Sequence, residues 1–391
     1  MPCFIPEEET LDPEALGRLQ RCKLQAVLDR VLASNSFYQQ KLGGVTFDAL
    51  HDSLDKLPLT TRDEIQRDQL AHPPYGSNLS FPLRSYSRLH QTSGSTGAPL
   101  RWLDTPQSWA WFLKCWRIIF AAACIEDGDR VFFPFSFGPF IGFWSAFDAA
   151  SQMGCLCLPG GGLGTTGRLG LLLDNQASVV CCTPTYALRL AEVARQEGVD
   201  LAASSIRVLI VAGEPGGSIP ATRQRIAKAW GAEVLDHAGM TEIGPWGFAC
   251  PGESDGMYVI ESEFVAEVID PGTLQPVPDG QLGELVLTNL GRAGSPLIRY
   301  RTGDLVRLRR DRGAGGRWFA RADGGILGRI DDMLFIRGNN VYPAAVEGIV
   351  RAFEEVAEFR MLVEESGQMA QMKLQVEFVP GADGAGLARR I

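Results

Sequence analysis

The stretch Gln91-Thr-Ser-Gly-Ser-Thr-Gly-Ala-Pro99 decides how the whole chain is interpreted. From Thr92 to Gly97 it contains only small hydroxylated residues and glycines. Such a loop exposes a dense row of backbone N–H groups, and its hydroxyls can donate hydrogen bonds to phosphate oxygens. It is not a Walker loop, because no Lys-Ser or Lys-Thr pair follows its second glycine. Alone, the stretch is equally typical of an ordinary turn, so its meaning depends on the rest of the chain.

The sequence after this loop alternates between strand and helix patterns. Short apolar runs are separated by helical patterns such as Tyr186–Gln196 and Ile219–Trp230. This alternation predicts a parallel sheet covered by helices on both faces. We also expect a long buried helix over 106–123 and a surface helix over 13–34. The four apolar runs begin at Val131, Cys155, Val179 and Val208.

After Trp246 the pattern changes to strands separated by turns. Met257–Ile269 and Gly283–Leu290 are expected to form strands of an antiparallel subdomain. A third unit begins at Gly328, and the patterns expected in it are a helix over 342–353 and strands over 359–364 and 371–378.

The predicted fold class is therefore α/β. The large N-terminal domain, residues 1–330, is expected to combine α/β subdomains with the antiparallel β subdomain. The small α+β C-terminal domain, residues 331–391, is expected to follow a hinge.

Composition excludes several function classes. With 391 residues, the chain is long enough for two or three domains. Its net charge of −9 argues against a non-specific binder of nucleic acid or of anionic membranes, since such a binder needs a basic surface. The start of the sequence does not resemble a signal peptide, and no run of 18 apolar residues suggests a membrane span. The nine cysteines lack zinc-knuckle or redox spacing, so we expect buried, reduced thiols in a cytoplasmic protein.

Five ordered motifs carry the functional signal. This series resembles the adenylate-forming superfamily of acyl- and aryl-CoA ligases, luciferases and peptide-synthetase adenylation domains. Within it, flanking phrases such as Leu59-Thr-Thr-Arg-Asp63 and Pro296-Leu-Ile-Arg-Tyr300 resemble the phenylacetate–CoA ligase branch, and the resemblance runs from about residue 13 to the end. The motifs are Thr92-Ser-Gly-Ser-Thr-Gly97, Ala212-Gly-Glu-Pro215, Asp236-His-Ala-Gly-Met-Thr-Glu242, Tyr300-Arg-Thr-Gly-Asp304, and Gly328-Arg-Ile-Asp-Asp-Met333 with Gly338-Asn-Asn-Val-Tyr-Pro343.

The resemblance implies a site for ATP. It assigns Thr241 and Glu242 to the α-phosphate and to Mg²⁺, a cation that prefers carboxylate, phosphate and water oxygens. Asp304 is implied to accept hydrogen bonds from the ribose hydroxyls, with Arg329 contacting ribose and phosphate. Thr241, Glu242 and Arg329 are the expected catalytic residues. The other nucleotide-binding residues implied are Ser93, Ser95, Thr96 and Gly97 at the β- and γ-phosphates, Gly213, Glu214, Pro215 and Asp236 at the adenine, and His237, Ala238, Gly239 and Met240 beside them.

Each of these residues also has an ordinary structural interpretation. Asp304 follows a glycine and could cap a turn. Glu242 could be a surface carboxylate, and Arg329 could pair on the surface with Asp331 or Asp332, where such pairs contribute little. The order of all five motifs favours the functional interpretation over these separate alternatives.

An aromatic stretch is expected to form the acid pocket. The resemblance places this pocket between the phosphate loop and the Phe135–Trp144 region, whose aromatic walls suit a flat aromatic acid. A phenylalanine-rich core is the alternative for each residue. His237 could bond a polar ring substituent or be a structural histidine. The residues expected in the pocket are Phe135, Phe137, Gly138, Phe140, Ala212, His237, Gly239 and Trp246.

The reaction implied is activation of an aromatic carboxylic acid by ATP and Mg²⁺, followed by transfer to CoA. The first alternative is the same adenylation with a carrier protein or an amine as acceptor. The second is a nucleotide-binding protein with weak catalysis. A homodimer is left open. Neither a nucleic-acid partner nor a membrane partner is expected.

The chain departs from the family pattern at four places. Ala238 stands where the family usually has an adenine-stacking Tyr, and Ala98 replaces a common Lys after the phosphate loop. A structural zinc is not expected, because Cys250 remains but Tyr258 and the stretch 313–317 lack the other ligands. The chain also stops before the expected C-terminal Lys, which favours a truncated form. Asp331 matches the family's hinge between the two domains.

Overall fold

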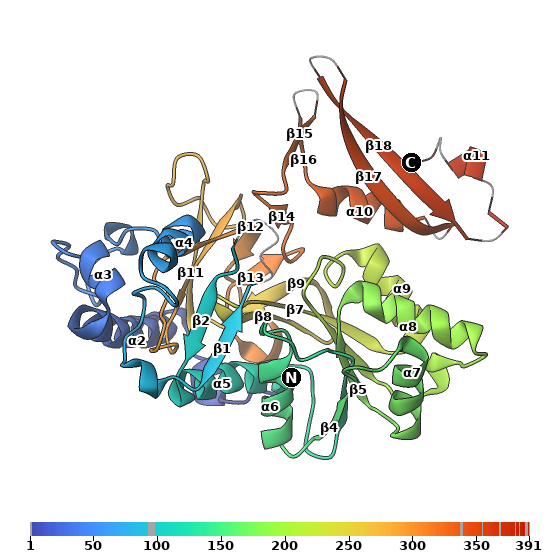
Figure 1. The fold of residues 1–391 in the computed structure, drawn as a ribbon, viewed down its shortest axis with the longest axis horizontal. Coiled ribbons are helices and arrows are strands. Elements are labelled where there is room, and N and C mark those ends of the chain that lie inside the picture. Colours follow the sequence, from blue (N-terminus) through green and yellow to red (C-terminus); the bar gives the residue numbers. More distant parts are fainter. Residues whose placement is uncertain are drawn as a thin grey trace.

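A single mixed sheet forms the centre of the protein (Figure 1). The computed structural model describes residues 2–92, 98–336, 339–353, 355–366, 369–379, 381–382, 384–387 and 390. Within them, twelve strands join in the order β10-β11-β12-β13-β9-β8-β7-β6-β5-β3-β4, and β14 pairs with β12. The predicted antiparallel part is thus not a separate sheet, because β8 continues the hydrogen bonding from β7.

The half from β4 to β7 is parallel, as the alternating apolar runs predicted. Its strands are β3 (Arg130–Phe133), β4 (Leu156–Pro159), β5 (Val179–Cys182), β6 (Val208–Val211) and β7 (Glu233–Met240). The connecting helices are α6 (Trp144–Gln152), α7 (Thr165–Asp174), α8 (Pro184–Gln196) and α9 (Pro220–Trp230). All four pairings in this half are parallel.

Both faces of this parallel half are covered, which explains its nearly continuous apolar strands. Val131 and Phe133 pack into the cluster that contains α5 (Pro106–Ala122) and α6, whereas Phe132 packs on the other face with α7, α8 and α9. The helix expected over 106–123 is α5, and its tryptophans lie in the core as anticipated.

The other half of the sheet is antiparallel. Its strands are β8 (Gly244–Cys250), β9 (Glu253–Val259), β10 (Phe264–Ile269), β11 (Leu282–Asn289), β12 (Tyr300–Arg309), β13 (Arg321–Asp323) and β14 (Gly328–Arg329). The single strand expected over 257–269 is wrong, because a turn at 260–263 divides it into β9 and β10. Within that turn the buried Glu263 carboxylate binds the partly buried Lys23 and Lys114.

The N-terminal residues form helices and a hairpin beside this sheet. They comprise α1 (Pro6–Glu9), α2 (Pro13–Ser34), α3 (Ser36–Lys41), α4 (Arg62–Ala71), and the strands β1 (Arg88–Gln91) and β2 (Arg101–Asp104). Thr61 caps α4 in a capping box with Glu64. Thr60 bridges to Tyr300, which brings the start of α4 next to β12.

The C-terminal residues form a lobe that stands apart from the sheet in Figure 1. It comprises β15 (Leu334–Ile336), β16 (Asn339–Val341), α10 (Pro343–Arg351), β17 (Val356–Ser366), β18 (Met369–Phe378) and α11 (Gly384–Leu387). Helix α10 contacts α9, and the Arg225 guanidinium donates to the Val356 carbonyl at 3.2 Å. Lys373, on β18, is exposed and pairs with Glu364 on β17.

None of the described helices is long and apolar enough to cross a membrane.

Candidate active site

The expected motifs follow the carboxyl ends of neighbouring parallel strands, where ligands bind in open α/β sheets. Val211, at the end of β6, is paired with Asp236 on β7. Ala212 and the loop after it therefore begin beside the Asp236–Glu242 motif. The Phe135–Trp144 stretch follows β3 in the same way. The topology thus brings three of the separate motifs to one edge of the sheet.

Asp304 and Arg329 meet through strand pairing. They are register partners on β12 and β14, and the Arg329 guanidinium donates to Asp304 Oδ1 at 2.9 Å. Asp304 is only 2% exposed, and its Oδ2 has no hydrogen-bond partner among the described residues. Burial raises the Asp304 pKa to about 7. A buried acceptor without a donor usually costs 1–3 kcal/mol, so this oxygen is suited to a ligand that brings a donor.

The surface pair of Arg329 with Asp331 is weaker than its pair with Asp304. Its guanidinium lies 3.9 Å from Asp331, farther than from Asp304. Gly303, which has φ +75°, lies directly beneath this arginine, and a Cβ there would come within 3.2 Å of the guanidinium. Glycine at this position therefore gives Arg329 room to reach Asp304.

Thr241 and Glu242 form the turn that joins β7 to β8. Glu242 is 8% exposed, which excludes the alternative of an ordinary surface carboxylate. Burial raises the pKa of Glu242, and the nearby cations of Arg62 and Arg292 act in the opposite direction. The Arg62 guanidinium lies 3.6 Å from the Glu242 carboxylate. A buried carboxylate at this position has the donor chemistry that Mg²⁺ prefers.

A buried ion pair lies behind this turn and was not foreseen from the sequence. The Arg292 guanidinium donates to both carboxylate oxygens of Asp104 at 2.8 Å, and neither side chain is exposed. It also donates to the carbonyls of Thr241, at 2.8 Å, and Glu242, at 2.6 Å. The only signal in the sequence was a lone charged residue among small ones, Gly291-Arg-Ala-Gly294.

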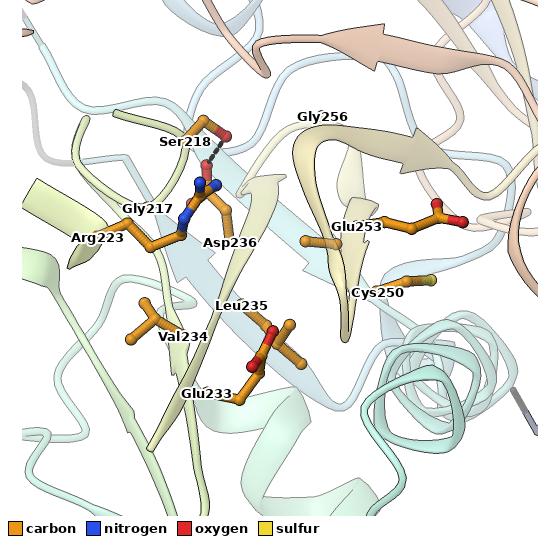
Figure 2. Close-up of a pocket in the computed structure, with 11 residues that line it drawn as sticks. Gly217, Ser218, Arg223, Glu233, Val234, Leu235, Asp236, Cys250, Glu253 and Gly256 are labelled. Carbon is orange, nitrogen blue, oxygen red and sulfur yellow. Dashed lines mark hydrogen bonds between the residues drawn. The ribbon is translucent and has the colours of Figure 1, made fainter. Parts of the chain in front are cut away.

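The Asp236 carboxylate is engaged by its own protein. Figure 2 shows the Ser218 hydroxyl donating to Asp236, with the Arg223 side chain extending toward the same carboxylate. Burial raises the Asp236 pKa to about 6. Gly217 lies so close that a Cβ there would come within 2.3 Å of Asp236 Oδ1. The cavity beside these residues measures about 10 Å³, which is room for about one water.

The predicted adenine-binding loop is shaped by glycines and by one carboxylate. Gly213 has φ +93°, a backbone conformation that glycine adopts without strain. The Glu214 carboxylate accepts from the Thr185 N–H at 2.7 Å and so helps to satisfy the N-terminus of α8. One oxygen of the Glu214 carboxylate therefore supports the fold, and the role of this residue at the adenine stays a prediction.

The sequence of the phosphate loop falls between β1 and β2, which pair as an antiparallel hairpin that we call the phosphate hairpin. Ser93, Ser95, Thr96 and Gly97 fall outside the described residues, so their roles remain predictions. Next to the ends of these two strands, which we call the neck of the hairpin, the Thr92 hydroxyl accepts from the Leu100 N–H at 3.0 Å. The Gln91 N–H donates to the Pro139 carbonyl at 2.8 Å, which joins the hairpin to the aromatic stretch.

The aromatic stretch forms a compact cluster of edge-on rings. The Phe135 ring lies 5.0 Å from Phe137 and 5.2 Å from Phe140, and Phe137 lies 4.9 Å from Trp144. Phe140 is 42% exposed, which leaves an apolar ring at the surface of the cluster. A Cβ on Gly142 would come within 2.1 Å of the Phe135 ring, so glycine is needed there. Gly138 accepts through its carbonyl from the Trp144 indole.

His237 and Trp246 lie deeper than the rest of the expected pocket. His237 Nδ1 bonds the Gly247 carbonyl at 2.7 Å, and its ring packs 4.4 Å from Trp116. Burial lowers the His237 pKa to about 4, so the ring is neutral at pH 7 with Nδ1 as its donor. Trp246 is fully buried, which agrees better with the core alternative than with direct contact to a ligand. Ala238 is also buried on β7, whereas Gly239 and Met240 end that strand.

The region considered for zinc has other contacts. The Tyr258 hydroxyl donates to Glu253 at 2.5 Å. Cys250 is buried, and burial raises the pKa of its thiol to about 12.

With this geometry established, comparisons define the class of protein. The AMP-binding enzyme family model matches residues 84–292, and that of the AMP-binding enzyme C-terminal domain matches residues 338–388. The chain belongs to the AMP-binding enzyme family, so the expected resemblance is confirmed. It is 34% identical to the phenylacetate-coenzyme A ligase of Thermus thermophilus over 382 residues, which cover 96% of this chain and 84% of that protein.

Solved structures confirm the fold and distinguish two conformations. Residues covering 98% of this chain match 83% of a 2-hydroxyisobutyryl-CoA ligase in its postadenylation state, with 29% identity and a TM-score of 0.92. In the thioesterification state of that ligase, the match covers 98% and 84%, with 30% identity and a TM-score of 0.80. The chain's arrangement is therefore closer to the postadenylation state of this relative.

Proposed function

We propose that this protein is an ATP-dependent ligase that activates a small aromatic carboxylic acid as an acyl-AMP and transfers the acyl group to CoA. One observation carries the proposal. The Arg329 guanidinium donates to Asp304 Oδ1, whereas the buried Oδ2 of the same carboxylate has no hydrogen-bond donor among the described residues. Membership of the AMP-binding family and the similarity to a phenylacetate-coenzyme A ligase support it.

In the first step, a substrate carboxylate oxygen attacks the α-phosphorus of ATP, and the bond to the pyrophosphate oxygen breaks. Asp304 accepts hydrogen bonds from the ribose hydroxyls, and Arg329 offsets charge beside it. Thr241 is assigned to the α-phosphate, and residues 93–97, which lie outside the described residues, to the departing pyrophosphate. Glu242 would hold Mg²⁺, which neutralises phosphate charge when bound. Keeping two anions in line is the main task of these residues.

In the second step, the thiol sulfur of CoA attacks the acyl carbonyl, its proton is lost, and AMP leaves. We propose that the C-terminal residues 331–391 form the mobile domain for this step and turn at Asp331. Asp331 is exposed and follows β14, at the point where the separate lobe begins. The two TM-scores against one relative support a change of arrangement between the steps.

The aromatic cluster supports an aromatic acid as substrate. Phe135, Phe137 and Phe140 offer flat apolar faces and edges next to the neck of the phosphate hairpin. A carrier protein or an amine is the alternative acceptor, and a homodimer remains open. A cytoplasmic location is part of the proposal, because the cysteines are free thiols and ATP and CoA are intracellular metabolites.

Pyrophosphate exchange tests the proposal. ATP–pyrophosphate exchange is measured with a panel of benzoic and phenylacetic acids, and CoA consumption is followed separately. We expect exchange that depends on one or a few acids, and thioester formation when CoA is added. Exchange without CoA consumption would favour the alternative acceptors. A complete lack of exchange would overturn the adenylation itself and favour a nucleotide-binding protein with weak catalysis.

A further inference from the structure

Arg292 occupies a position that no part of the proposed chemistry explains. Its guanidinium is fully buried, yet it makes four hydrogen bonds. Two go to the Asp104 carboxylate, and two go to the consecutive carbonyls of Thr241 and Glu242. The rings of Trp102 and Phe112 lie 5.3 and 4.9 Å from the guanidinium carbon and help to exclude water from it.

These bonds join three segments that are distant in sequence. Asp104 ends β2, which is one of the two strands of the phosphate hairpin. Thr241 and Glu242 form the turn from β7 to β8, and Arg292 itself lies between β11 and β12. One planar group therefore sets the place of the Thr241–Glu242 backbone relative to the phosphate hairpin. A guanidinium suits this task because its donors have a fixed geometry.

A purely structural role explains less of this arrangement. Buried ion pairs add little to stability on average, because removing two charges from water is costly. Elsewhere in the chain, Arg317 makes a comparable fully buried pair with Glu9 and also donates to the Pro2 carbonyl, so these bonds hold the N-terminal segment. Arg292 differs because two of its bonds hold the backbone of the expected catalytic residues.

We propose that Arg292, anchored by Asp104, is a positioning residue that holds the Thr241 hydroxyl and the Glu242 carboxylate in register with the phosphate hairpin during adenylation. The inference rests on the proposed function. We expect its largest effect on the first half-reaction, because the Mg²⁺ that Glu242 would hold neutralises phosphate charge as pyrophosphate leaves.

The test separates the two half-reactions in the full chain. Arg292→Lys keeps the charge but cannot make all four bonds, and Asp104→Asn removes the anchor with little change of shape. We expect either variant to raise the Mg²⁺ concentration for half-maximal ATP–pyrophosphate exchange by about 10–100-fold, as seen when groups orienting a metal ligand are removed. Thioester formation from a supplied acyl adenylate and CoA should fall by a smaller factor, because that half-reaction keeps the Thr241 contact to the α-phosphate but releases no pyrophosphate.

Arg317→Lys is the matched control, because it weakens a buried pair of the same kind. It should lower the unfolding midpoint without moving the Mg²⁺ requirement. If Arg292→Lys and Asp104→Asn behave like Arg317→Lys, with an unchanged Mg²⁺ requirement, Arg292 is only structural and the inference is wrong. Should Arg292→Lys fail to fold, Asp104→Asn decides alone. A wild-type protein inactive with every acid would remove the proposed function first, and this inference with it.

Discussion

Two buried carboxylates in this molecule have opposite surroundings. Glu9 has partners for both oxygens, since Oε1 accepts from the Ile5 N–H and Oε2 accepts twice from Arg317. Asp304 has Arg329 on one oxygen and no described partner on the other. Because buried polar groups are normally satisfied, the complete pair is explained by the fold alone, whereas the incomplete one supports the ligand contact proposed for Asp304.

The largest loss of stability is expected when the Glu9–Arg317 ion pair is broken. Arg317→Met leaves the Glu9 carboxylate buried without its cation and should lower the free energy of unfolding by about 3–5 kcal/mol. Urea denaturation measures this, and exchange activity per folded molecule should stay near that of the wild type. A double variant, Glu9→Leu with Arg317→Met, should recover much of the loss. If the single variant is as stable as the wild type, the distinction between the two regions fails.

The largest catalytic loss is expected at Glu242. Glu242→Gln keeps the shape but removes the charge that would hold Mg²⁺, so ATP–pyrophosphate exchange should fall by at least about 100-fold, or about 3 kcal/mol. The unfolding midpoint should not fall, because an uncharged amide is cheaper to bury than a carboxylate. Full exchange in this variant would show that Glu242 has been assigned the wrong role.

A substitution of Asp304 tests whether this incompletely paired carboxylate binds ATP. Asp304→Ala removes the acceptor proposed for the ribose hydroxyls and should raise the KM for ATP by about 10–100-fold, as expected for hydrogen bonds to a charged group. The KM for the acid should change much less. Asp311→Ala, on an exposed loop, serves as the matched control and should leave both constants unchanged. Equal effects of the two substitutions would contradict the assignment.

The smallest expected effect is a pH dependence of stability. The Asp304 pKa is about 7 in the folded protein and near 3.8 when unfolded, so the folded state holds a proton that the unfolded state loses between pH 4 and 7. Protonated Asp304 therefore leaves the folded state at its full stability below pH 4. The free energy of unfolding then falls as the pH rises through 7, because the buried carboxyl must ionise. Asp304→Asn should match the wild type near pH 4 and exceed it by about 1–2 kcal/mol at pH 8. Unfolding curves that stay parallel across this range would rule out a raised pKa.

The sequence predicted what depends on local pattern. The periodicity located α5, because it depends on residues close in the chain. The alternating apolar runs likewise predicted the parallel half of the sheet. Both the family and the fold inferred from the ordered motifs are confirmed.

The sequence could not predict contacts made across long separations. Asp104 and Arg292 are 188 residues apart, and neither lies in a stretch with a distinctive pattern. The bond from Thr185 to Glu214 has the same character, and it gives one carboxylate oxygen of this predicted site residue a structural partner. The turn that ends β9 was missed because the partners of its glutamates are distant in sequence, Lys23 and Lys114 for Glu263 and Arg310 for Glu261.

The bridge between Thr60 and Tyr300 has a consequence for how the protein is made. It joins residues that are 240 positions apart, and the ion pair of Asp104 likewise cannot form until Arg292 has been synthesised. Contacts of such long sequence separation form late, because the intervening chain must first be ordered. During synthesis, a ribosome must therefore release most of the large sheet before the proposed ATP site can assemble. A nascent or partly folded chain should consequently not compete for ATP.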